Sequence, residues 1–165
     1  MADENRGGAL WRFAVAVYQK PRVSDACLLL QDRHGCNVTL LLFAAWAGAE
    51  HGVALTADEM AAAGNAVRPW HGEVVEPLRA VRRRLKHGPP PAPDNATAKL
   101  RAQIQAVEID AERIELETLA GFLPERRDDI GITATLANLA LAAALAENIE
   151  SSDSLRTIAN AALSP

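Results

Sequence analysis

The stretch from Val38 to Ala49 contains no charged residue, and it limits the possible folds more than any other feature of the chain. If this stretch is helical, its large side chains point in every direction around the helix axis. These side chains are Leu40, Leu41, Leu42, Phe43 and Trp46. A helix that is apolar on all sides is a buried helix. We therefore expect other helices to surround residues 38–49.

Composition supports a helical fold for the rest of the chain. The 165 residues are 49% hydrophobic but only 4% aromatic, and Ala and Leu dominate, which favours closely packed helices over sheets. The length suits one domain with a substantial core. We predict an all-α, single-domain helical bundle of about six to eight helices. The domain is expected to span 9–163, after a disordered leader at 1–8, with an exposed Pro-rich linker at 88–94.

A short polar corner precedes the central stretch. Gly35 stands where a helix ends in a left-handed residue, and Asn37 where the next helix needs a side-chain cap. Asp32 falls in the last helical turn, where free carbonyls disfavour a carboxylate by about 0.3–1 kcal/mol. Either Asp32 fixes the corner by hydrogen bonding or pairing with an arginine, or the corner forms a pocket for a small ligand. The candidate pocket residues are Gln31, Asp32, His34 and Asn37.

A second apolar pattern begins near Pro69. Its residues recur at spacings of three and four and predict a buried stripe made of Val67, Trp70, Val74, Leu78, Val81 and Leu85. Pro77 lacks an amide donor and clashes with the carbonyl of Glu73, so a kink or break is expected between Glu73 and Glu76. In the pocket hypothesis, His71 and Glu73 could contribute from this kink.

Opposite that stripe lies a candidate basic interaction face, formed by Arg79, Arg82, Arg83 and Lys86. Such a face could contact the phosphates of a nucleic acid. However, it lacks interleaved aromatic residues and a recognised binding motif, and the whole chain carries a net charge of −4. Residues 1–99 hold 12 basic and 10 acidic side chains, whereas residues 100–165 hold 5 and 11. We expect a solvated face, or one that pairs with the acidic later helix, and no nucleic-acid partner.

The later helix carries two predicted apolar stripes. The first contains Leu100, Ile104, Val107, Ala111, Ile114 and Thr118, and the second contains Ile109, Leu116, Ala120 and Leu123. Its carboxylates, Glu108, Asp110, Glu112, Glu115 and Glu117, have a spacing that can ligate metals in a bundle. No Glu-x-x-His pair accompanies them, and Cys27 and Cys36 lack the spacing of a zinc site. We therefore expect neither a metal nor a cofactor.

Two sequence blocks occur in order along the chain. The first is Leu-Gln-Asp-Arg-His-Gly-Cys-Asn-Val-Thr-Leu-Leu-Leu-Phe-Ala-Ala-Trp, preceded by Leu10-Trp11 and by Tyr18-x-x-Pro21-x-Val23. The second is Trp70-x-x-x-Val-Val-x-Pro-Leu-Arg-x-x-Arg-Arg-x-Leu-Lys86. Together they resemble an uncharacterised bacterial family of small all-helical proteins, catalogued as a domain of unknown function. The resemblance covers roughly residues 10 to 120. It implies one compact domain in a bacterial cytoplasm, and no activity, cofactor or catalytic residue.

The sequence does not determine a biochemical function. Its polar, acidic start lacks the order of a signal peptide, and the uncharged run from Ile130 to Ala146 falls short of a membrane span. We expect a cytoplasmic protein without a membrane partner. The leading hypothesis is a non-enzymatic helical protein-interaction module whose surplus apolar stripes meet another protein or a second copy. The alternative is an enzyme or small-ligand-binding protein with its pocket at the Gln31–Asn37 corner.

Overall fold

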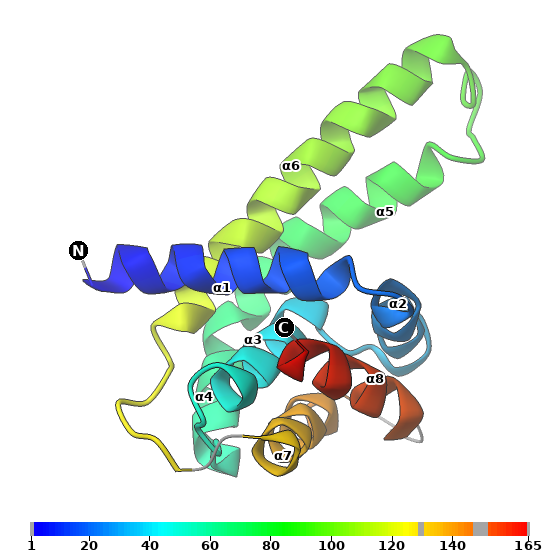
Figure 1. The fold of residues 1–165 in the computed structure, drawn as a ribbon. Coiled ribbons are helices and arrows are strands. Elements are labelled where there is room, and N and C mark those ends of the chain that lie inside the picture. The colour runs from blue at the N-terminus through cyan, green and yellow to red at the C-terminus, as the bar shows by residue number, and fades with distance from the viewer. Residues whose placement is uncertain (1, 129–130, 147–151, 165) are drawn as a thin grey trace. The chain divides into compact units, whose positions relative to one another are not determined.

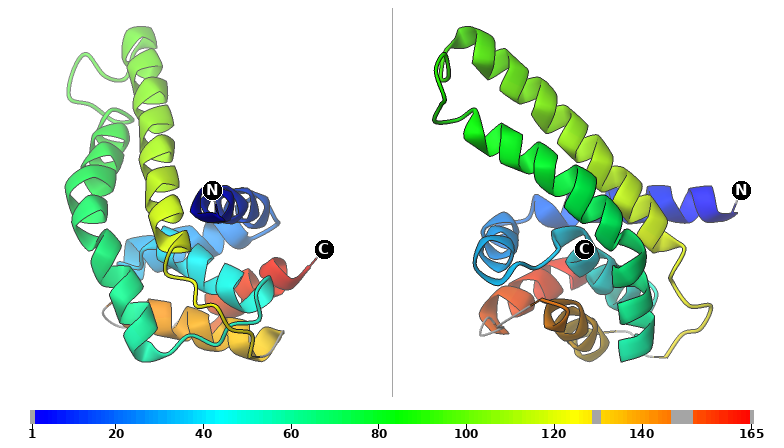
Figure 2. Two further views of the ribbon diagram at one scale, coloured as in Figure 1. Left: turned by 90° about the vertical axis from the view of Figure 1, so that its left-hand side faces the viewer. Right: turned by 180° about the vertical axis from the view of Figure 1, so that it is seen from behind.

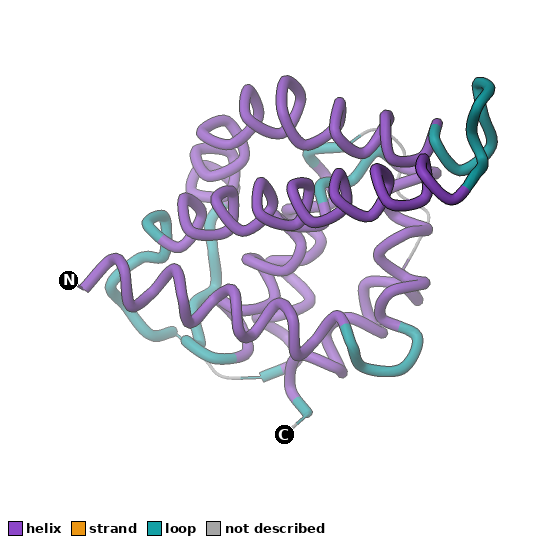
Figure 3. Tube along the Cα trace, turned by 90° about the horizontal axis from the view of Figure 1, so that it is seen from above, coloured by secondary structure: helices purple, strands orange, loops and turns teal. Residues whose placement is uncertain are grey.

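The structure is a computed structural model that describes residues 2–128, 131–146 and 152–164 (Figure 1). About 76% of the described residues are helical, and these residues contain no strand, so the all-α prediction is confirmed (Figure 3). The elements are α1 (Ala2–Tyr18), α2 (Val23–His34), α3 (Val38–Ala49), α4 (Ala57–Trp70), the π-helical turn η1 (His71–Val75), α5 (Glu76–Arg84), α6 (Asn95–Ala120), α7 (Ile132–Ala144) and α8 (Ser152–Leu163). None of the described helices is both long enough and apolar enough to cross a membrane.

Contacts within the chain separate it into two compact units, where the sequence analysis predicted one domain over 9–163. Unit 1 contains residues 1–66 and 116–165, and unit 2 contains residues 67–115. Helices α4 and α6 each begin in one unit and end in the other.

Helix α3 is the centre of unit 1, as predicted. Every residue from Thr39 to Gly48 is buried, and α3 contacts α1, α2, α7 and α8 (Figures 1 and 2). The contact with α7 is close because Gly48 has no side chain: a Cβ there would lie 2.6 Å from the Cα of Thr135. Trp46 is buried, and its ring meets the His51 ring in an edge-to-face arrangement with 4.3 Å between the ring centroids.

Residues 2–8, which the sequence analysis assigned to a disordered leader, form the first turns of α1, which begins at Ala2. Contacts with other residues of unit 1 hold this part of α1 in place. Gly7 packs so closely on Glu117 that an added Cβ would lie 3.0 Å from its Cγ. Arg6 also forms an ion pair with Glu125, at 3.1 Å between Nη2 and Oε1. Met1 lies outside the described residues.

The segment between α3 and α4 is held by the side chain of Asn138, which is 0% exposed. Its Oδ1 accepts a hydrogen bond from the amide of Leu55 at 2.8 Å. Its Nδ2 donates to the carbonyl of Val53 at 2.8 Å and to that of Ala44 at 3.3 Å. One buried amide group on α7 therefore satisfies three backbone groups of α3 and of the segment that follows it.

A second cluster fixes the start of α4. Thr56 and Glu59 bond each other's backbone amides at 2.9 and 3.2 Å, which is the capping box typical of a helix start. Arg126 pairs with Glu59 and Asp128 and donates to the carbonyl of Ala54 at 2.7 Å. The hydrogen bonds from Arg126 and from the Thr56 amide lower the pKa of Glu59 to about 2.

Unit 2 is an antiparallel helical hairpin, here called the hairpin, in which η1 and α5 lie beside α6 (Figure 2). The predicted interruption before Pro77 is present as η1, where the amide of Glu76 donates to the carbonyl of His71. The wider π-helical turn accommodates a proline that has no amide donor. The Pro-rich segment 88–94 connects the two helices and is mostly exposed.

Candidate functional site

At the corner of residues 31–37, Asn37 serves as the predicted helix cap. Its Oδ1 accepts hydrogen bonds from the amides of Thr39 and Leu40, at 2.9 and 3.3 Å, and from the Thr39 hydroxyl at 2.6 Å. Gly35 has the predicted left-handed conformation, with φ 65°, and ends α2. The side-chain oxygen of Asn37 is therefore used in building the start of α3.

Asp32 lies in the last turn of α2, as the sequence predicts. The residue is exposed, and its Oδ1 accepts a hydrogen bond from Nε2 of Gln31 at 3.2 Å. His34 is half-buried. Solvent screens the unfavourable interaction between a carboxylate and an exposed helix end. The pocket hypothesis for Gln31, Asp32, His34 and Asn37 gains no support from this geometry.

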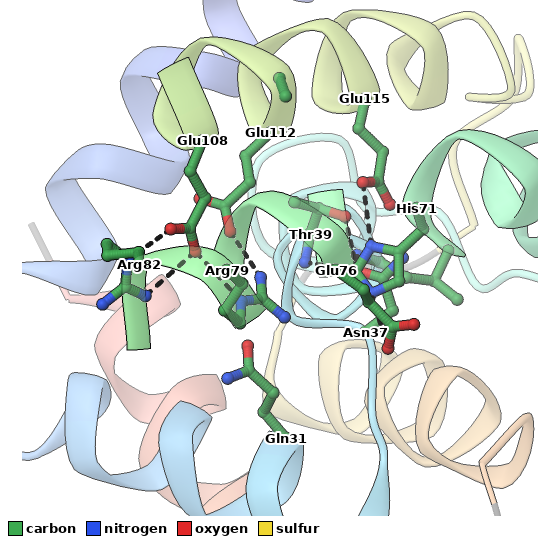
Figure 4. Close-up of polar contacts among 12 residues, drawn as sticks. Gln31, Asn37, Thr39, His71, Glu76, Arg79, Arg82, Glu108, Glu112 and Glu115 are labelled. Atoms are coloured by element: carbon green, nitrogen blue, oxygen red, sulfur yellow. Dashed lines mark hydrogen bonds and ion pairs between the residues drawn. The ribbon is translucent and has the colours of Figure 1, made fainter. Parts of the chain in front are cut away.

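The interior of the hairpin contains ion pairs between α5 and α6 (Figure 4). Arg79 donates from Nε to Glu108 at 3.1 Å and from Nη2 to Glu112 at 2.7 Å. Arg82 donates to both carboxylate oxygens of Glu108, at 3.1 Å from Nη2 to Oε1 and also from Nε to Oε2. Glu108 is 4% exposed and Arg79 is 8% exposed. These contacts are therefore part of the hairpin's packed interior.

Of the candidate basic face, Arg79 and Arg82 thus pair with the acidic helix, as one of the two favoured explanations anticipated. Arg83 and Lys86 belong to the exposed surface. The four side chains therefore do not form one continuous basic surface. This division removes half of the phosphate contacts that the nucleic-acid hypothesis required.

The pKa values of Glu108 and Glu112, which both pair with Arg79, are shifted in opposite directions. Burial raises the pKa of Glu108, but hydrogen bonds and charge attraction from Arg82 and Arg79 outweigh it, so the pKa lies below the usual value. Burial also raises the pKa of Glu112, and Arg79 only partly offsets it, so this pKa lies above the usual value. The negative charge of Glu108 contributes to that increase. The difference arises because Glu108 has two arginine partners and Glu112 has one.

Near the π-helical turn, His71 pairs with a buried carboxylate from α6. Its Nδ1 lies 3.1 Å from Oε2 of Glu115, whose side chain is fully buried, and its Nε2 lies 4.0 Å from Oε1 of Glu76. Trp70 donates from its indole to the carbonyl of Ala111 at 3.0 Å. His71 was predicted from the sequence as a possible pocket residue, but Glu115 was not predicted as its partner. The spacing of four and three in Glu108, Glu112 and Glu115 was the available signal, since it places all three on one helix face.

The metal hypothesis was not favoured by the sequence, and the structure adds nothing to it. In the described parts of the chain, no group of three or more His, Cys, Asp or Glu residues is placed to hold a metal ion. Cys27 and Cys36 are free thiols, and burial raises the pKa of Cys27 to about 12. A buried thiol with a raised pKa is a poor nucleophile.

One side of the hairpin exposes apolar residues instead of burying them. A groove of about 440 Å³ is lined by Glu73, Val74, Pro77, Leu78, Val81, Ile104 and Val107. Val81 is 48% exposed and Val107 is 52% exposed. Leu100 and Ile114 are also exposed, and each is seven residues from Val107, so all three share one side of α6.

These residues define what we call the apolar face: Val74, Leu78, Val81, Leu100, Ile104, Val107 and Ile114. The prediction of a continuous buried stripe from Val67 to Leu85 is therefore wrong at Val81. The reason is that α5 turns Arg79 and Arg82 toward the carboxylates of α6, which leaves Val81 at the open groove.

Comparison with known proteins gives a family and no activity. The family model described as "Protein of unknown function (DUF2390)" matches residues 9–119. No curated protein and no solved structure is a match for this chain.

Proposed function

Since the chain belongs to the DUF2390 family of proteins of unknown function, we propose a function from its site alone. We propose that it is a non-enzymatic helical protein-interaction module, and that the apolar face of the hairpin is its contact surface. We further propose that it acts in the cytoplasm of a bacterium. Two free, buried thiols fit a reducing compartment of that kind.

The observation that carries this proposal is the inverted distribution of side chains in the hairpin. Charged groups of Arg79, Glu108 and Glu115 are buried, whereas Val81 and Val107 are about half exposed. Single exposed apolar residues are ordinary in soluble proteins, but a contiguous row beside a groove is a feature of interaction sites. A partner that covered the row would remove this apolar area from water and gain free energy in proportion to it.

Site-specific photo-crosslinking in living cells tests the proposal. We would place the photoreactive residue p-benzoyl-phenylalanine at Val107, on the apolar face, in the full chain. The matched control places it at Ile109, which is 41% exposed and about 200° away around the same helix. We expect protein adducts from position 107 and few or none from position 109. Equal yields from both positions, or no adduct from 107, would contradict the proposal.

A further inference from the structure

We infer that the occupant of the apolar face is a second copy of this chain, and that the two hairpins pack face to face and antiparallel. This inference rests on the function proposed above, because it needs the apolar face to be a contact surface. It adds the identity of the partner and the direction in which that partner lies.

The spacing of the exposed apolar residues along α6 suits contact with a second copy. Leu100, Val107 and Ile114 are separated by seven residues each and are all exposed. Such a row is symmetric about its centre. In an antiparallel pair with a two-fold axis at Val107, Val107 meets itself and Leu100 meets Ile114 of the partner. A two-fold interface requires this kind of self-complementary surface.

The exposed charges of the hairpin are unevenly distributed along its length. At the end near the connecting segment, the exposed charges are mostly basic: Arg83, Arg84, Lys86 and Lys99, against Asp94. At the opposite end, the exposed acidic residues Glu73, Glu76 and Asp110 outnumber the exposed basic residues Arg68 and Arg113, and Glu73 lines the groove. Pairing the two basic ends would place like charges together, whereas antiparallel pairing places each basic end against the end where acidic side chains are in excess.

One pair of oppositely charged residues, Glu73 and Arg84, suits this antiparallel pairing. Glu73 and Arg84 lie at nearly equal distances along the chain from Leu78, one on each side of the groove's centre. A two-fold axis there brings Glu73 of each copy toward Arg84 of the other. Arg79 bonds Glu108 and Glu112, so this level of α5 lies within about one helical turn of Val107 on α6. One axis can therefore serve both helices.

The experiment measures the mass of the full chain in solution by sedimentation velocity over a range of concentrations and at low salt. We expect a reversible dimer of twice the 17.6 kDa chain mass. Val107→Glu and Val81→Glu should each give a monomer, because they place a charge in the centre of the contact. Ile109→Glu is the matched control and should remain dimeric. Circular dichroism of each variant checks that its helices are intact.

A charge exchange tests the antiparallel direction. Glu73→Arg and Arg84→Glu should each weaken self-association about tenfold, since the two-fold axis repeats every repulsive contact. An equal mixture of the two variants should dimerise as well as the wild type, because opposite charges then meet at both ends. If the mixture fails to recover, the antiparallel arrangement is overturned. If the dimer persists in both Val107→Glu and Val81→Glu, it uses another surface, and the inference that two apolar faces meet is overturned.

The crosslinking experiment separates this inference from the proposed function. An adduct from position 107 at twice the chain mass supports both. An adduct of another mass, together with a monomeric wild type in solution, supports the interaction module and overturns the second copy as its partner. No adduct and no dimer would overturn both.

Discussion

The buried Glu108 and the half-buried Glu112 of the hairpin should respond differently to the same substitution. Glu108 accepts hydrogen bonds from Arg79 and from Arg82, while Glu112 accepts one from Arg79. We predict that Glu108→Gln destabilises the protein at pH 7 and that Glu112→Gln does not. Glutamine has nearly the same shape as glutamate, so each change removes a charge and leaves the packing unaltered.

The expected loss of unfolding free energy in Glu108→Gln follows from the two arginine partners of Glu108. Removing one charge of a buried ion pair costs about 3–5 kcal/mol, because the other charge is left uncompensated. The Arg82 side chain is 21% exposed and can recover some hydration, and the glutamine oxygen still accepts a hydrogen bond. We therefore expect a loss of about 2–4 kcal/mol. For Glu112→Gln we expect a change within about 1 kcal/mol, because the substitution also removes the cost of burying a carboxylate.

The pH dependence gives a sharper test. The pKa of Glu108 is lowered from 4.5 by folding, so its stabilisation is present above pH 4.5 and is lost as pH falls through the lower folded value. The stability difference between the wild type and Glu108→Gln should therefore shrink below pH 4.5. The pKa of Glu112 is raised from 4.5, so burying its carboxylate destabilises the fold above the raised value and ceases to do so on acidification.

Urea unfolding at pH 7 and pH 4, followed by circular dichroism, measures both stability effects. A nuclear magnetic resonance titration adds a third result: the pKa of Glu112 should fall in Glu108→Gln, since a neighbouring negative charge has been removed. Equal losses for the two variants, or a loss for Glu108→Gln that does not change with pH, would refute this account of the ion pairs.

The remaining predictions concern unit 1 and use the same unfolding assay. Trp46→Ala should cost about 3–5 kcal/mol, the range for truncating a large buried aromatic, and a loss below about 1 kcal/mol would contradict its burial. Asn138→Ala should cost at least about 2 kcal/mol, because it leaves the buried amide of Leu55 without a hydrogen bond. Stabilisation by Glu59 should be present above pH 4.5 and lost as pH falls toward about 2, where Glu59→Gln should match the wild type. Asp32→Asn should change stability by no more than about 0.5 kcal/mol, because Asp32 is exposed; a larger loss would reveal a structural role.

Local features of the fold could be predicted because a few residues determine them. Gly35 and Asn37 mark the end of α2 and the start of α3, and the apolar composition of 38–49 identifies α3 as the central helix. Pro77 predicts an interruption because its missing amide has only local consequences. In each case the cause lies within about five residues of the effect.

The arrangement of the hairpin could not be predicted in the same way. Periodicity shows which residues share a helix side, but α6 has both an apolar side and a carboxylate side, and either could face α5. The assumption that apolar sides face inward led to the wrong prediction for Val81. Asn138 was missed for a different reason: its role depends on backbone groups more than 80 residues away, and a single asparagine in an Ala-rich helix has no periodic signal.

The hairpin buries charged side chains and exposes apolar ones, and this distribution limits its stability in the isolated chain. Buried ion pairs contribute little net stability, because the attraction between the charges mainly offsets the cost of removing them from water. The apolar residues Val81 and Val107 contribute little while they remain exposed, since hydrophobic stabilisation requires that their area leaves water. Both potential sources of stability in the hairpin are therefore largely unused in the isolated chain. A partner that covered the apolar face would remove this apolar area from water and so add hydrophobic stabilisation. Binding there should therefore also stabilise the hairpin.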